Sequence, residues 1–185
     1  MKCNSKNGLS AVAETEKDAI DMIGSTNFNN VYHIECLDAE GNLKWEDVVY
    51  NTVVNEGLND VLTVYFKAGT GAAHYVGLIT GPGATVLAAE TLASKAWTEN
   101  VAYTAPRPTL TLGSVASQSV DNSASKASFA ITGTATIGGI FIAESATQSE
   151  TASTLYGGGA FTGGDKSVAN TDTLNVTVTL TTSSA

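Results

Sequence analysis

The chain has 185 residues and a mass of 19.0 kDa, the size of one domain or of one domain with a small extension. Its 9 Lys and Arg against 18 Asp and Glu give a net charge of -9, which excludes the basic surface that binds nucleic acid or an anionic membrane. Only 15% of the residues are charged, Pro numbers 3 and Gly numbers 18, so the composition predicts a folded, β-rich chain and not a disordered one.

The N-terminal part of the chain differs from the rest. Residues 1–60 hold 11 acidic and 4 basic residues (net -7), whereas residues 61–185 hold 7 and 5 (net -2). The basic start is not followed by the apolar stretch of a secretory signal, and no window approaches the roughly 18 apolar residues of a membrane span. We therefore expect a soluble protein that is made in a cytoplasm.

Residues 1–30 are predicted to form an N-terminal arm, helical or extended, outside a β-sandwich domain of residues 31–185. Residues 9–23 fit a helix with a thin apolar stripe, and the polar run 24–30 ends it. Such a helix is marginal alone, so it must pack on another surface, either its own domain or a neighbouring subunit. For the second case we predict these interaction residues: Leu9, Val12, Ile20, Ile23 and Phe28.

A hairpin and a helix are predicted next. Residues 32–37 and 43–50 alternate as two antiparallel strands, and residues 38–42 form the turn between them. Residues 55–66 carry the strongest helical signal, with Asn55 or Asn59 as the N-cap. The apolar stripe of this helix consists of Leu58, Val61, Leu62 and Tyr65.

The remainder of the chain has the pattern of short strands. The last of them alternates without exception, with Leu174 and Val176 on one face and Asn175 and Thr177 on the other. We expect a short helical turn over residues 87–95 and an extended segment over residues 103–108. The fold class is therefore mainly β, an antiparallel two-sheet β-sandwich with one short helix. Its further predicted strands are residues 74–79, 110–115, 127–131, 136–143 and 174–180.

Catalytic and metal-binding residue types are scarce. The only histidines are His33 and His74, and neither belongs to a nucleophile motif, so each is expected to be a hydrogen-bonded strand residue. Cys3 and Cys36 are too few for a disulfide framework and are expected to be free thiols. A zinc site would need both pairs, but His33 and Cys36 point to opposite faces of one strand. We predict no catalytic residue, no cofactor and no metal.

Three weaker motifs have ordinary structural explanations. The run 159–167 is similar to a phosphate-binding loop, but Asp165 stands where that motif needs Lys, so we interpret it as a glycine turn between strands. Residues 38–42 alternate oxygen side chains as calcium loops do, but a hairpin turn explains them. The Trp and Tyr residues could form a sugar-stacking platform, although core positions are the default.

Segments spread over most of the chain, residues 32–182, together carry a resemblance to a known family. These segments are Ile34-Glu35-Cys36, Gly41-Asn42-Leu43-Lys44-Trp45, Val53-Val54-Asn55-Glu56-Gly57-Leu58-Asn59, Tyr75-Val76-Gly77-Leu78, Trp97-Thr98-Glu99, Arg107-Pro108, Ser123-Ala124-Ser125-Lys126-Ala127, Gly139-Ile140-Phe141, Thr154-Leu155-Tyr156-Gly157 and Thr173-Leu174-Asn175-Val176-Thr177-Val178-Thr179-Leu180. With them, the chain resembles a family of small structural proteins of tailed bacteriophages, which includes head decoration and tail proteins. Residues 1–30 lie outside the resemblance.

The resemblance implies a virion component that is not an enzyme. The first expectation is a decoration, or cement, protein on the capsid exterior, made in the host bacterial cytoplasm, which binds the major capsid protein and neighbouring copies of itself as a homo-oligomer. Many copies on one lattice let modest contacts add up. The alternative is a tail or fibre component that contacts host-surface glycans. An enzyme that uses His33 or His74 is the third possibility.

Overall fold

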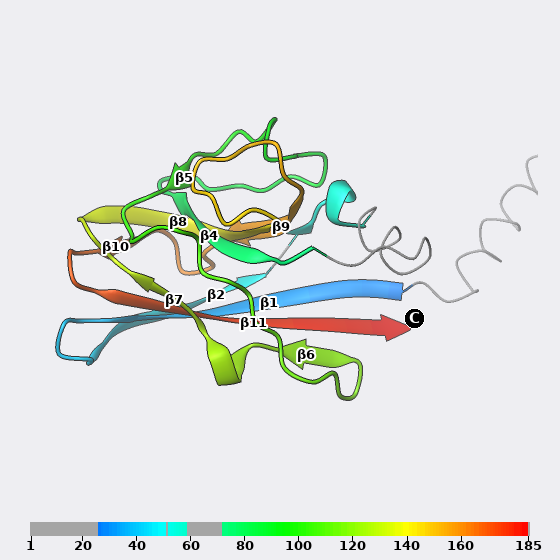
Figure 1. Ribbon diagram of the computed structural model, residues 1–185, viewed down its shortest axis with the longest axis horizontal. Helices are drawn as coiled ribbons and strands as arrows, with labels where there is room; N and C mark the ends of the chain where they lie inside the picture. Colours follow the sequence, from blue (N-terminus) through cyan, green and yellow to red (C-terminus); the bar gives the residue numbers. More distant parts are fainter. Residues whose placement is uncertain (1–25, 51, 59–71, 185) are drawn as a thin grey trace, which may run out of the picture.

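The computed structural model describes residues 26–50, 52–58 and 72–184. Within them, two antiparallel sheets pack face to face, which confirms the predicted sandwich (Figure 1). Sheet A contains β1 (Thr26–Leu37), β2 (Leu43–Tyr50), β6 (Ser119–Asp121), β7 (Ala127–Ala130) and β11 (Thr173–Ser184). Sheet B contains β3 (Thr52–Val53), β4 (Tyr75–Thr80), β5 (Glu99–Asn100), β8 (Ala135–Ala143), β9 (Leu155–Ala160) and β10 (Lys166–Val168).

Sheet A is built on the pairing of the first and last strands. β1 and β11 are antiparallel along their full 12 residues, from Thr26 opposite Ser184 to Leu37 opposite Thr173. β2 pairs with the other edge of β1, as the predicted hairpin requires, and β6 and β7 follow one another along β11. Between β6 and β7 no strand pairs with β11, and the Asn122 side chain takes the hydrogen bonds that a strand would make there. Its amide oxygen accepts from Val178 N at 2.6 Å, and its amide nitrogen donates to Val176 O at 3.2 Å.

The core between the sheets follows the alternation in sheet A. Tyr32, Ile34 and Cys36 on β1 are fully buried, and so are Leu174, Val176 and Val178 on β11. They meet Leu78 of β4 and Ile140 of β8 from the facing sheet. Because one face of sheet A is buried and the other is not, its strands show the two-residue period that the sequence displays.

Sheet B is covered on both faces. Its outer side buries a second apolar cluster under the segment between β4 and β5. Trp97 from that segment packs on Phe141 of β8, with the ring centroids 4.8 Å apart. The cluster consists of Val54, Ile79, Ala84, Val86, Leu92, Trp97, Phe141, Ala143 and Leu155. β8 is therefore apolar on both sides, and its last seven residues are all buried.

A buried ion pair fixes the segment after β5. Arg107 Nε and Nη2 donate to the Glu99 carboxylate at 2.8 and 2.7 Å, and the Tyr103 hydroxyl and Ser149 N donate to the same carboxylate. Arg107 Nη1 reaches Ser145 O at 2.8 Å. The buried charges of Arg107 and Glu99 therefore neutralise each other, and each is also hydrogen-bonded to other groups, as burial of an ion pair requires.

Several predicted boundaries change. β1 begins at Thr26, so residues 26–30 are strand and not the predicted break, because β11 continues to Ser184 and offers them a pairing partner. Residues 87–95 form turns without a helix. Residues 110–115 are not a strand: Leu110 N donates to His74 O and Gly113 N donates to Asp121 O of β6, but these separate bonds do not form a continuous strand ladder. The predicted helix starts at Asn55 and is described to Leu58, and residues 59–66 lie outside the described residues.

The glycine-rich stretch is only partly a turn. Residues 157–159 lie in β9, and the turn begins after Ala160 and leads into β10, with Gly164 at φ +74°. A Cβ on Gly158 would lie 2.5 Å from Ile140 O, so the close approach of β8 requires glycine there.

None of the helices in the part of the chain that the structure describes is long and apolar enough to cross a membrane.

Candidate functional site

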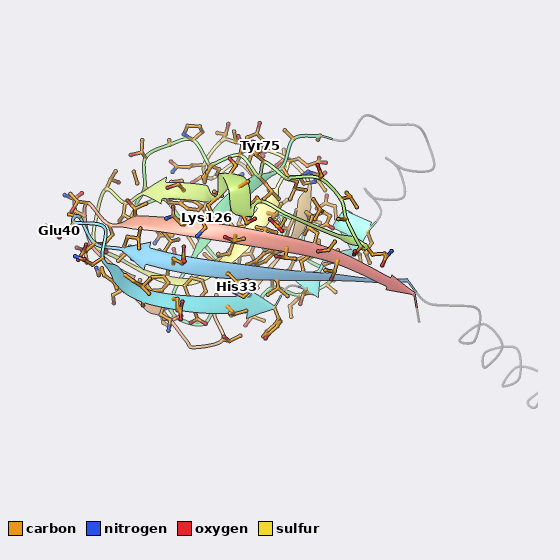
Figure 2. All side chains as sticks on the ribbon, turned by 90° about the horizontal axis from the view of Figure 1, so that it is seen from below. His33, Glu40, Tyr75 and Lys126 are labelled. Carbon is orange, nitrogen blue, oxygen red and sulfur yellow. The ribbon has the colours of Figure 1, made fainter. Side chains whose placement is uncertain are left out.

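The outer face of sheet A is the broadest uncovered sheet face of the described residues. We call it the outer face; it carries His33 and Glu35 on β1, with Val48 and Glu46 opposite them on β2 and Thr177 and Asn175 opposite them on β11. In Figure 2, which looks onto this face, β2, β1 and β11 lie in front of the rest of the molecule. The part of the chain that the structure describes therefore leaves this face accessible.

Hydroxyl and amide groups dominate the chemistry of the outer face. Thr173, Asn175, Thr177 and Thr179 form a row along β11, and all of them are half-buried. Charge is partly neutralised, because Lys126 Nζ lies 2.5 Å from Glu35 Oε2 beside this row. Both partners of this pair are more than a third exposed, so it contributes little to stability.

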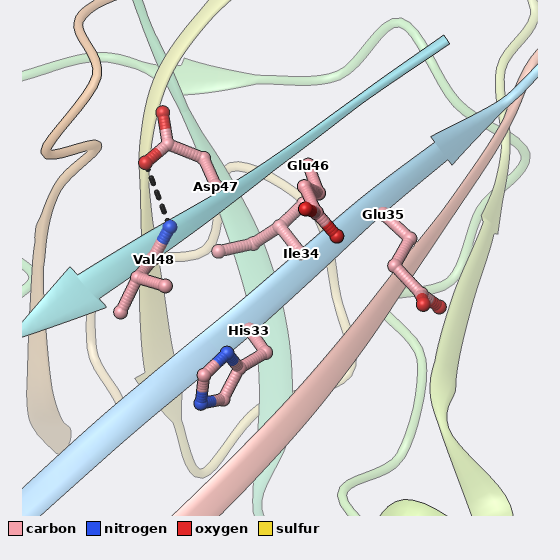
Figure 3. A pocket seen from close by; sticks show the side chains of 6 residues that line it. All are labelled: His33, Ile34, Glu35, Glu46, Asp47 and Val48. Carbon is pink, nitrogen blue, oxygen red and sulfur yellow. Dashed lines mark hydrogen bonds between the residues drawn. The ribbon is translucent and has the colours of Figure 1, made fainter. Parts of the chain in front are cut away.

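A shallow hollow of about 390 Å³ lies between β1 and β2. Figure 3 shows that the His33 and Glu35 side chains project from β1 beside Glu46 and Val48 of β2, while Val48 N donates to Asp47 Oδ1 at 2.7 Å. The hollow is lined by both polar and apolar atoms and is widely open to solvent. It suits contact with a protein surface better than the enclosure of a small molecule.

The edge of β2 that does not pair with β1 is hydrogen-bonded to the turn between β9 and β10. Thr162 Oγ1 and Gly163 N donate to the Asp47 carboxylate, and Thr162 N donates to Val48 O at 3.1 Å. Burial raises the pKa of Asp47, but the Lys166 ammonium at 3.0 Å and these donors together hold it below its ordinary value. The turn thus occupies part of an edge that would otherwise pair with other chains.

The candidate catalytic and metal-binding residues, His33, His74 and Cys36, are not brought together in one site. His33 is exposed on the outer face, whereas His74 packs edge-on against the Tyr156 ring at 5.5 Å. Cys36 is a free thiol buried on the opposite face of β1 from His33, as predicted. Among the residues that the structure describes, no group of three His, Cys, Asp or Glu side chains is arranged to hold a metal ion.

The Cys36 thiol belongs to a small polar cluster inside one rim of the sandwich. Its Sγ lies 3.7 Å from Asp172 Oδ2, and Lys44 Nζ lies 2.5 Å from the same oxygen. Burial, together with the Asp172 charge, raises the pKa of the thiol to about 11. The cysteine is therefore protonated and poorly nucleophilic at neutral pH.

The predicted arm residues are only partly placed. Leu9, Val12, Ile20 and Ile23 lie outside the described residues. Phe28 belongs to β1, where its backbone is opposite Thr182. The alternation of residues 174–180 predicted the polar side of β11, but not its juxtaposition with His33 and Glu46, because that depends on pairing between the two ends of the chain.

Comparisons of the chain with protein-family models, with curated proteins and with solved structures give no match.

Proposed function

We propose that this chain is a non-enzymatic structural protein of a bacteriophage virion, a head decoration (cement) protein that binds the outside of the capsid lattice and stabilises it. The observation that carries the proposal is the outer face of sheet A, which no described residue covers and which is polar, with its charge partly neutralised by the pair of Lys126 and Glu35. The resemblance of residues 32–182 to small phage structural proteins supplies the class of partner. The contact would be with the major capsid protein.

The dimensions of the outer face favour a partner that is present in many copies. Four strand columns spaced about 4.8 Å apart, each about seven residues long, give a face of roughly 19 by 23 Å. This is below the roughly 800 Å² per partner of a stable protein pair. One such contact is weak, but repetition over a lattice and binding only to the assembled shell make the sum stabilising.

The chemistry of this face suits an adhesive contact. Threonine hydroxyls and the Asn175 amide donate and accept hydrogen bonds without the desolvation cost of unpaired charges. The excess of acidic residues keeps free subunits soluble before they meet the shell. The free protein therefore needs no cofactor or metal to be competent for docking.

The test is the place and number of copies in the virion. Cryo-electron microscopy of the particle that carries this chain should show it on the head exterior, with a copy number set by the capsid lattice. A few copies confined to the tail, together with retention of host glycans by the isolated chain, would overturn the proposal in favour of the tail or fibre alternative.

A matched pair of variants tests the surface itself. Thr177→Arg places a long charged side chain in the middle of the outer face. Thr151→Arg makes the same change at an exposed position in the loop between β8 and β9 of sheet B. We expect head binding to fall at least about tenfold for the first, equivalent to about 1.4 kcal/mol, and to stay unchanged for the second. Equal binding by both variants would remove the outer face from the contact.

A further inference from the structure

An apolar groove lies at one end of the sandwich, away from the outer face. It is formed between β6, the end of β11 and β9, and its two parts have volumes of about 240 and 80 Å³. Val115 and Leu112 on its rim are 75% and 39% exposed. Its lining includes Val115, Val120, Leu112, Ile142, Tyr156 and Leu180.

The two terminal strands project past this groove. Leu180, in the groove, is opposite Asn30, but β1 continues to Thr26 opposite Ser184. Among the described strands, β2 pairs with β1 only as far as Val31, and β6 pairs with β11 only as far as Thr181. Beyond Thr181 and its partner Asn29, β1 and β11 therefore run on together for three residue pairs, roughly 10 Å, as a two-stranded ribbon, which Figure 1 shows extending toward the end marked C.

We propose that the groove is the docking site for residues 9–23 of a neighbouring copy of this chain. Leu9, Val12, Ile20 and Ile23 supply an apolar stripe of the kind that an amphipathic helix lays into an apolar groove. The described part of β1 begins at Thr26, beyond the groove of its own copy, so the chain that precedes Thr26 starts from the end of the molecule that a copy placed end to end would face. The inference rests on the proposed function only in that a lattice supplies such neighbours.

The charges of the two surfaces are compatible. The groove is lined mainly by apolar atoms and contains no carboxylate among its lining residues. Residues 9–23 carry four acidic residues and one lysine, and these lie largely off the apolar stripe. A helix docked by its stripe therefore keeps its carboxylates in solvent, where burial does not penalise them.

The test uses the full-length protein in solution, without phage particles. Val115 is replaced by a photoreactive benzophenone amino acid, and ordinary and ¹⁵N-labelled protein are mixed in equal amounts. We expect crosslinks to residues 9–23, about half of which join an ordinary chain to a labelled one, the value for random exchange between copies. The same amino acid at Leu43, which is 56% exposed at the start of β2 beside the hairpin turn, should give no such crosslink.

Each other outcome overturns the inference. Crosslinks between equally labelled chains alone would place the arm in its own groove, and crosslinks elsewhere or none would remove the groove as its receptor. Sedimentation equilibrium supplies a second measurement: Val115→Asp should abolish self-association, and Leu43→Asp should leave it unchanged. If exchange occurs but the protein does not bind heads, the proposed function fails while this inference stands.

Discussion

The two sheets differ in how many of their faces are buried. Sheet A buries one face in the core and leaves the other open, so its strands alternate. Sheet B buries both faces, so β8 is apolar and buried from Ile137 onward, and β9 is rich in glycine. Among the described residues, the outer face of sheet A is therefore the sheet face on which the proposed partner would bind.

The largest expected effect breaks an ion pair on the side of sheet B. Arg107→Met leaves Glu99 as a buried unpaired charge and should lower the free energy of unfolding by about 3–5 kcal/mol. Lys126→Met, which breaks the exposed pair of sheet A, should cost less than about 1 kcal/mol. Urea unfolding of both variants measures the difference, and equal losses would contradict the contrast between the two sheets.

The next effect tests how tightly sheet B is packed. Gly158→Ala pushes a methyl group to 2.5 Å from Ile140 O and 3.0 Å from Phe141 Cα, both part of the paired strand β8. Because backbone cannot yield easily, we expect a loss of about 1–3 kcal/mol. Gly133→Ala is the control, since a Cβ there meets nothing within 4 Å, and thermal unfolding should find it close to the native protein. A Gly158→Ala variant that melts like this control would show that β8 and β9 are loosely paired.

These glycines also mark what could not be predicted from the sequence. Alternation is a local signal, so β1, β2, β7 and β11 were predicted, and so was the apolar strand β8. Glycine lacks a side chain to show a pattern, and the need for it in β9 comes from the backbone of β8. Likewise, the burial of Glu99 in β5 depends on Arg107, Tyr103 and Ser149, which reach its carboxylate from other parts of the chain.

The outer face was predicted only in part for the same reason. Its polar row on β11 follows from local alternation in residues 174–180. Its breadth depends on β1 lying beside β11, a pairing between residues more than a hundred positions apart. The segment 110–115 shows the converse: its pattern favoured a strand, but it makes separate backbone hydrogen bonds, from Leu110 N to His74 O and from Gly113 N to Asp121 O, and no continuous ladder.

A smaller effect concerns the rim of sheet A and depends on pH. Burial raises the pKa of Asp172, but Lys44 and the donor Ala169 N more than offset this and hold it below its ordinary value. A lowered pKa in the folded state gives stability that is present above the unfolded pKa and lost as the pH falls through the folded one. Asp172→Asn should therefore cost about 1–2 kcal/mol at pH 7 and much less near pH 2.

The measurement is a series of urea unfolding curves between pH 7 and pH 2 for the native protein and Asp172→Asn. The two stabilities should converge as the pH falls through the acidic range. A difference that stays constant with pH would mean that Asp172 contributes by its shape and not by its charge.

The smallest effect is expected at the centre of the outer face, and it sharpens the comparison most directly. Thr177 and Val176 are neighbours on β11, but Val176 is fully buried in the core while Thr177 faces outward. If nothing folds over this face, Thr177→Val should change the free energy of unfolding by no more than about 0.5 kcal/mol, because valine suits a strand and no buried hydrogen bond is lost. Val176→Thr buries an additional hydroxyl on the same strand and should cost about 1–3 kcal/mol. Comparable losses for the two variants would mean that the outer face is packed like the inner one, and sheet A would then have no open side on which a capsid could bind.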